Sequence, residues 1–169
     1  LNMVIKGFFK KYLNSGDEVL TTKAEHASLL LPLFEIAKEK DIKIHYIELE
    51  SDMSVSIENV EKAITKNTKL IALSHITNVI GDIRPIGDII KLAHKNNILT
   101  LIDGAQSVPH KKIDVSALDI DFLCFSAHKM LGATGLGILY GKEKLLNDIK
   151  NGIANNTINH RIVFAFDKQ

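Results

Sequence analysis

Polar residues able to do chemistry follow the apolar runs of this sequence, each at the point where a predicted strand ends. Asp103 comes directly after Leu-Thr-Leu-Ile, and Lys129 comes shortly after Phe-Leu-Cys-Phe. In open α/β sheets, ligands bind beyond the carboxyl ends of the strands. The strand ends present carboxyl, imidazole, amide, hydroxyl and amine groups, from Glu25, His26, His75, Asn78, Asp103, Gln106, Ser126, His128 and Lys129.

Asp103 and Lys129 each allow two interpretations. Asp103 precedes a glycine, and Asp-Gly is a common turn pair, so it could be a turn residue or a functional acid. Lysine usually marks solvated surface, but Lys129 stands in a segment with little other charge. A low-dielectric strand end would push its pKa down, and a neutral amine attacks aldehydes. The alternative is a lysine that reaches water or binds phosphate.

Other polar residues give weaker signals. Single histidines such as His75 and His128 are more often structural than catalytic. Cys124 is four residues before His128, but no second Cys/His pair has metal-site spacing, so no metal is expected and Cys124 is predicted to be a core residue. Ser126 lacks the Gly-x-Ser-x-Gly elbow. The glycines of 132–137 fit turns better than a dinucleotide motif.

The combination of an acid on one strand end and an amine on a later one suits pyridoxal 5'-phosphate. A carboxylate from Asp103 would keep the ring nitrogen protonated, and Lys129 would hold the cofactor as a Schiff base. Hydroxyl, imidazole and backbone N–H groups would bind the phosphate. Amide side chains would lie near the phenolic oxygen.

The elements that must position these residues alternate along the chain. Apolar runs rich in β-branched residues predict strands at 18–23, 43–49, 69–75, 98–102, 120–125 and 137–141. Amphipathic stretches predict helices at 28–40, 56–65, 85–96 and 142–150, after a helix-like pattern at 1–13. Pro32 is expected in the first turn of its helix, and Ser56 as an N-cap. This alternation predicts an α/β three-layer sandwich with a mainly parallel sheet.

Composition excludes several classes of protein. The chain has 169 residues, a net charge of +1, 24% charged residues, no Trp and one Cys. We therefore expect one core-forming domain, with no basic face for nucleic acid or a membrane surface. The lone Cys124 suits a reducing compartment, and no membrane span or signal peptide is visible, so a cytoplasmic protein is expected.

The character of the sequence changes near residue 150. Residues 1–150 keep the strand and helix periodicity, whereas 151–169 begin Asn-rich and lack a period. We therefore predict one α/β domain over 1–150, which the resemblance described below implies is a partial cofactor-binding large domain. Residues 151–169 are predicted to be a loop or disordered tail.

Four motifs, in order along 1–150, resemble the class V aminotransferase family of fold-type-I pyridoxal-phosphate enzymes, closest to SufS-like cysteine desulfurases. They are Glu25-His26, Ser74-His-Ile-Thr-Asn-Val-Ile-Gly81, Leu101-Ile-Asp-Gly-Ala-Gln-Ser107 and Phe125-Ser-Ala-His-Lys-Met-Leu-Gly-Ala-Thr-Gly-Leu-Gly-Ile-Leu-Tyr140. The resemblance implies the large domain of that fold, with seven strands in the complete protein. It also implies roles for individual residues: Lys129 as the Schiff-base lysine, Asp103 at the pyridine nitrogen, His26 stacked on the ring, Asn78 and Gln106 near the phenolic oxygen, and Ser126 and His128 at the phosphate.

The resemblance further implies an activity. A cysteine desulfurase converts L-cysteine to L-alanine and passes the sulfur on as a persulfide, as in iron-sulfur cluster assembly. The implied partners are a second copy in a homodimer and a sulfur-acceptor protein. The family's phosphate loop would precede Leu1, and its catalytic cysteine and substrate arginine would follow residue 150. We therefore expect a fragment that is inactive alone. Alternatives are another class V enzyme such as selenocysteine lyase, or a truncated non-catalytic product.

Overall fold

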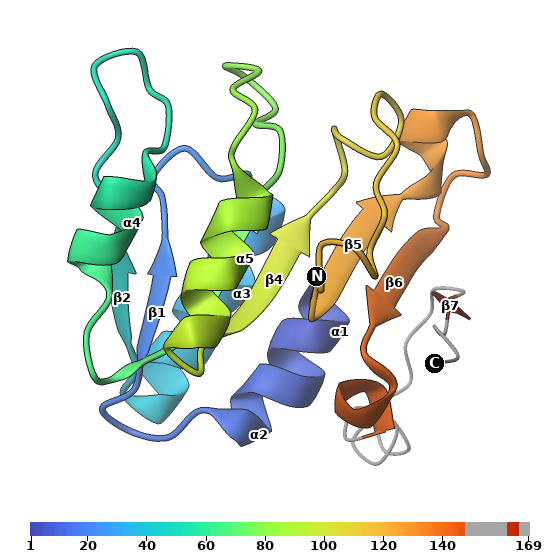
Figure 1. Ribbon diagram of the computed structural model, residues 1–169. Helices are drawn as coiled ribbons and strands as arrows, with labels where there is room; N and C mark the ends of the chain where they lie inside the picture. The colour runs from blue at the N-terminus through green and yellow to red at the C-terminus, as the bar shows by residue number, and fades with distance from the viewer. Residues whose placement is uncertain (148–161, 166–169) are drawn as a thin grey trace.

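The chain folds around one sheet (Figure 1). The computed structural model describes residues 1–147 and, by backbone alone, 162–165. The strands are β1 (Glu18–Thr21), β2 (Lys43–Tyr46), β3 (Thr68–Ser74), β4 (Leu99–Asp103), β5 (Phe122–Ser126), β6 (Gly137–Gly141) and β7 (Ile162–Ala165). The helices are α1 (Asn2–Val4), the π-helix η1 (Ile5–Phe9), α2 (Lys10–Tyr12), α3 (Ala27–Lys40), α4 (Ile57–Ala63), α5 (Ile86–Lys95) and the 3₁₀-helix η2 (Ala127–Met130). Residues 143–147 are also helical.

The sheet has the order β2-β1-β3-β4-β5-β6-β7. Strands β2, β1, β3, β4 and β5 pair in parallel with their neighbours, β5 pairs antiparallel with β6, and β6 pairs in parallel with β7. The prediction of a mainly parallel α/β sheet is therefore confirmed. In Figure 1 the arrowheads of β1, β4 and β5 point to the same edge, so the strand-end residues converge there.

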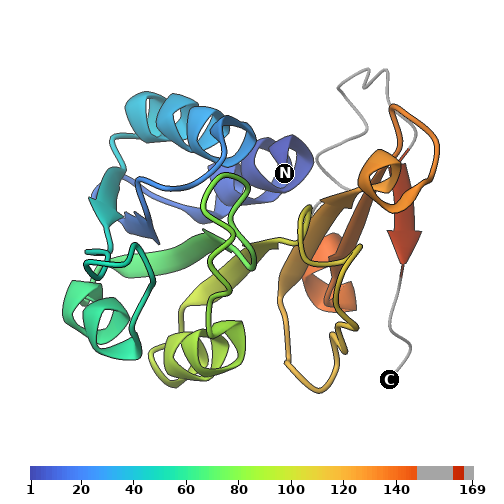
Figure 2. The same ribbon diagram turned by 90° about the horizontal axis from the view of Figure 1, so that it is seen from above.

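Helices cover both faces of the sheet and make three layers. Seen from above, α3 and the N-terminal helices lie on one side, and α4 and α5 lie on the other (Figure 2). Side chains alternate between these two cores along each strand. In β3, Ala72 joins the cluster beneath α3, whereas Leu73 packs with Val60 of α4 and Ile89 of α5. Burial on both faces explains why the central strands are continuous apolar runs.

Most predicted elements are present, with ends that differ by a few residues. Ser56 caps α4 by accepting the Asn59 N–H at 3.2 Å, as predicted. Strand β5 begins at Phe122 rather than at residue 120. One reason is local: the Asp121 carboxylate, not a backbone carbonyl, accepts the Thr100 N–H at 2.9 Å.

The prediction for Pro32 was wrong. Helix α3 begins at Ala27 with His26 as its N-cap, so Pro32 lies inside the helix, in its second turn. Proline there removes the hydrogen bond to the carbonyl of Ser28, which is exposed and can be solvated. The ring itself is buried in the layer beneath α3.

Three remaining predictions concern the ends of the chain and the membrane. The predicted helix 142–150 is helical from 143 to 147, and its last residues lie outside the described part. Within the predicted tail, the backbone of 162–165 forms β7, and the division at residue 150 stays a prediction. Within residues 1–147 and 162–165, every helix is too short or too polar to cross a membrane.

Candidate functional site

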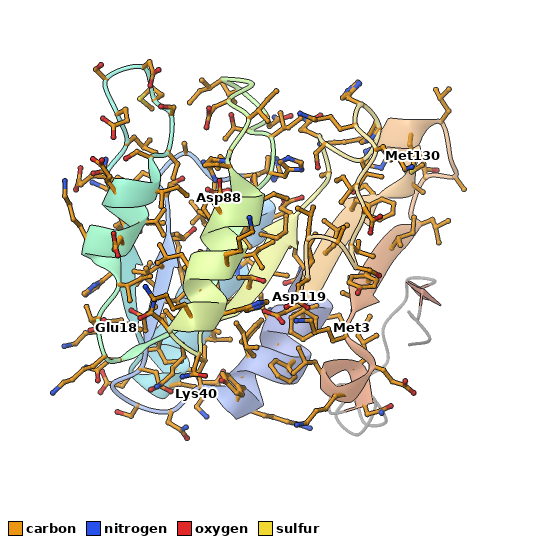
Figure 3. The ribbon with its side chains drawn as sticks, viewed as in Figure 1. Met3, Glu18, Lys40, Asp88, Asp119 and Met130 are labelled. Atoms are coloured by element: carbon orange, nitrogen blue, oxygen red, sulfur yellow. The ribbon has the colours of Figure 1, made fainter. Side chains whose placement is uncertain are left out.

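The strand-end residues gather along the upper edge of the sheet. Figure 3 places Met130, the last residue of η2, at this end of the molecule and Glu18, the first residue of β1, at the other. Asp103 ends β4, Ser74 ends the neighbouring β3, and Ser126 ends β5. The parallel register therefore brings together residues that are far apart in the sequence.

Asp103 is a buried acid of this edge. Its side chain accepts one hydrogen bond among the described residues, from the Ala105 N–H at 2.9 Å. Burial raises the pKa of Asp103; the Ala105 N–H acts against that rise, as does the Lys129 charge more weakly. A carboxyl group in this setting is short of donors, and a protonated ring nitrogen would be a suitable one.

Register fixes which side chains share a face with Asp103. Its partners are Ser74 on β3 and Cys124 on β5. Ser126, two residues beyond Cys124, falls on the same face because strands have a period of two. Cys124 itself is buried in the core cluster beneath α3, as predicted, and burial raises the pKa of its thiol.

Lys129 lies in η2, directly after β5, and its side chain is exposed. The low-dielectric setting expected for this lysine is therefore not provided by the described residues. The physical reason is position: η2 lies beyond the carboxyl end of β5, where His128 and Met130 are exposed as well. The role of Lys129 stays a prediction.

The two predicted amides contact each other. The Gln106 side chain donates a hydrogen bond to the Asn78 Oδ1, although 28 residues separate them. Gln106 belongs to the turn after β4, and Asn78 belongs to the loop after β3. They lie on the same edge as Asp103, where their roles near a phenolic oxygen remain predictions.

His26 has a structural contact that sequence reasoning missed. Its Nδ1 accepts the Ser28 N–H at 3.2 Å and caps α3. The Ser28 hydroxyl lies 2.7 Å from the same nitrogen. An Nδ1 that accepts carries no proton, so the neutral imidazole holds its proton on Nε2. The ring is exposed at the upper edge.

A fully buried ion pair that involves Glu25, the residue before His26, was also missed. Arg84 and Glu25 are each 0% exposed in their side chains and contact each other. Glu25 appeared in a motif, but its partner did not. A signal was available in the arginine between Ile83 and Pro85, directly before an amphipathic helix. The complete burial of Arg84 could not be predicted from so short a pattern.

His75 follows β3 and is buried, and its Nδ1 has no hydrogen-bond partner in the described part of the chain. Burial lowers the pKa of His75, and the Lys111 charge lowers it further. The prediction that His75 is a structural residue is compatible with its burial. Across residues 1–147, no group of three or more His, Cys, Asp or Glu side chains could hold a metal ion.

Comparison with known proteins gives the family. The model described as aminotransferase class-V matches residues 1–161. A probable cysteine desulfurase of Halalkalibacterium halodurans is 42% identical over 89% of this chain and 37% of its own length. The structure of the Escherichia coli cysteine desulfurase CsdA superposes with a TM-score of 0.84 at 35% identity, over 87% of this chain and 37% of that one.

A further solved structure, SspA in complex with cysteine, is 32% identical and has a TM-score of 0.71. It covers 78% of this chain, which covers 38% of SspA. The chain thus spans little more than a third of the relatives that it matches. The family match itself extends over nearly all of the sequence, and the chain therefore belongs to the class V aminotransferase family.

Proposed function

We propose that this chain is part of a pyridoxal-phosphate-dependent cysteine desulfurase. The reaction would convert L-cysteine to L-alanine and transfer the sulfur as a persulfide. The observation that carries the proposal is the buried Asp103 carboxyl, short of donors, beside the strand that leads to Lys129. Support for the substrate comes from the desulfurase relatives and from SspA, whose structure contains cysteine.

The residues present fit this cofactor. Asp103 would accept a hydrogen bond from the pyridinium nitrogen, which would compensate the cost of burying the carboxylate. Lys129 would hold the cofactor covalently through Nζ. Ser126 and His128 would bind the phosphate, which favours hydroxyl and imidazole donors. When bound, the cofactor supplies an electron sink for the substrate carbon.

The remaining residues would orient the cofactor and transfer protons. His26 would stack on the ring, and its Nε2–H is the proton that it could move, because Nδ1 is occupied by the α3 cap. Asn78 and Gln106, already in contact with each other, would stay near the phenolic oxygen. We propose that Lys129 moves a proton at the substrate once its amine is free.

The proposal extends to partners and location. A homodimer and a sulfur-acceptor protein are the partners we expect in the whole protein, in iron-sulfur cluster assembly. The buried, unpaired Cys124 is compatible with a reducing, cytoplasmic location. No nucleic acid or membrane partner is proposed.

Reductive labelling tests the cofactor site. The protein is mixed with pyridoxal phosphate, reduced with borohydride, digested and analysed by mass spectrometry. We expect one adduct, on Lys129, that disappears in Lys129→Ala and persists in Lys95→Ala, a matched exposed lysine at the far end of α5. Labelling scattered over surface lysines and unchanged in Lys129→Ala would contradict the proposal.

A further inference from the structure

The Glu25–Arg84 ion pair is fully buried. Taking two charges out of water is costly, and apolar replacements for such pairs are often as stable or more so. A buried pair is therefore weak evidence for a stabilising role. The place of this pair in the fold gives it another role.

The Glu25–Arg84 pair lies just beyond the paired residues of β1 and β3. The last register pair of these strands is Leu20 with Ile71. Beyond it, side-chain hydrogen bonds join the segment after β1 to the end of β3. The Glu25 carboxylate accepts the Ser74 N–H at 2.8 Å, the Ser74 hydroxyl at 2.6 Å and the Thr22 hydroxyl at 2.7 Å.

Arg84 completes this bridge from the other side. Its guanidinium donates to the Thr22 hydroxyl at 3.0 Å and to the Ser74 carbonyl at 3.3 Å. Its Nε lies 3.7 Å from the Asp82 carboxylate. The two terminal nitrogens of the planar guanidinium can contact Glu25, Thr22 and Ser74 at once because its donors form a fixed fork, whereas Nε has no hydrogen-bond partner among the described residues. The separation of the two strand ends is thereby set by side chains.

Three segments of the candidate site are attached to this bridge. Glu25 directly precedes His26. Ser74 is the register partner of Asp103. The backbone N–H of Arg84 donates to the His75 carbonyl at 2.9 Å and closes the loop that carries Asn78. Movement of the bridge would shift the imidazole, the acid and the amide relative to one another.

We propose that the Glu25–Arg84 pair is a positioning unit for the cofactor site, which fixes His26 against the end of β3, the strand whose last residue pairs with Asp103 of β4. The inference rests on the proposed function for the ligand, pyridoxal phosphate. Its first consequence, the geometry of His26, does not depend on the ligand. The N-cap needs His26 at its extended backbone angles, φ −67° and ψ 145°, and Glu25 anchors the preceding peptide.

The test compares three variants of the whole chain. Arg84→Met leaves the Glu25 carboxylate buried without its cation and serves as the severe change. Glu25→Gln with Arg84→Gln removes both charges and keeps an amide pair able to hydrogen-bond, in case the first variant does not fold. Lys142→Met is the matched control, because Lys142 contacts Asp119 and Asp121 at the opposite end of the strands.

Two readouts separate positioning from mere stability. The ¹⁵N shifts of the His26 ring, measured without cofactor, report which nitrogen carries the proton. We expect Nε2–H in the wild type and a mixture of tautomers in the double variant. Pyridoxal-phosphate affinity, from fluorescence titration, should fall about tenfold, by analogy with the loss of metal affinity when groups that orient metal ligands are removed.

In the control, unfolding by denaturant should be easier, but both site readouts should stay at wild-type values, because distant sites act independently. A folded double variant with an unchanged His26 tautomer and unchanged affinity would overturn the inference. If the wild type itself binds no pyridoxal phosphate at Lys129, the proposed function fails. The His26 shifts would still decide the positioning role.

Discussion

At the scale of single residues, Asp103 shows how burial of a site residue can lower the stability of the folded protein. Its carboxyl is buried at the end of β4 with one N–H donor. Burial raises its pKa above the usual value of 3.8. The folded state then keeps the proton to a higher pH than the unfolded state does. The free energy of unfolding therefore falls as pH rises through that interval, and the loss is complete once the pH exceeds the folded-state pKa of Asp103.

We predict that Asp103→Asn stabilises the cofactor-free protein at pH 7, by on the order of 1 kcal/mol, while it weakens pyridoxal-phosphate binding. Asparagine can still accept the Ala105 N–H, but it carries no charge. Urea unfolding at pH 7 and pH 4 measures the effect, which should be smaller at pH 4. Glu48→Gln, at an exposed carboxylate, is the control. A lower stability for Asp103→Asn at pH 7 would contradict this account.

At the scale of elements, the turn after η2 determines how the Lys129 segment returns to β6. A Cβ on Gly132 would lie 2.9 Å from the Ala127 carbonyl oxygen and 2.9 Å from its Cβ. Gly132 also donates its N–H to that carbonyl at 2.9 Å. The close approach of two backbone segments therefore requires glycine at this position.

We predict that Gly132→Ala forces η2 outward, destabilises the protein by about 1–3 kcal/mol, and reduces borohydride labelling of Lys129. Gly137→Ala is the matched control, because a Cβ there meets nothing closer than the Phe125 oxygen at 4.0 Å. Thermal unfolding and quantitative peptide mapping give the two readouts. Equal behaviour of the two variants would show that the turn is not tightly packed.

At the scale of the whole molecule, burial of His75 couples its protonation to global unfolding. Burial, followed by the Lys111 charge, lowers the pKa of His75 below its usual 6.5. The unfolded state then binds the proton first as pH falls. The folded state loses stability below about pH 6.5, until the folded histidine is itself protonated.

We predict that His75→Gln reduces the fall in the free energy of unfolding at acid pH. One such histidine changes the free energy of unfolding by at most about 1.4 kcal/mol per pH unit. Chemical denaturation between pH 5 and pH 8 measures the slope. His110→Gln, at an exposed histidine, should keep the wild-type slope. An unchanged slope in His75→Gln would assign the acid sensitivity to other groups.

The sequence by itself determined the helices and strands, and which polar residues lie at the strand ends. Periodicity indicates strands and helices because each repeat reflects which side of an element is buried. The run before Asp103, the cap at Ser56 and the core position of Cys124 could therefore be predicted. Motif resemblance added the family, which the match over residues 1–161 supports.

Only the tertiary structure decided which distant side chains meet. Glu25 and Arg84 are 59 residues apart and become partners because β1 and β3 are neighbours in the sheet. The exposure of Lys129 and the position of Pro32 inside α3 also depend on where elements begin and what covers them. Local sequence does not encode those facts, because burial is a property of the packed molecule and not of a short segment.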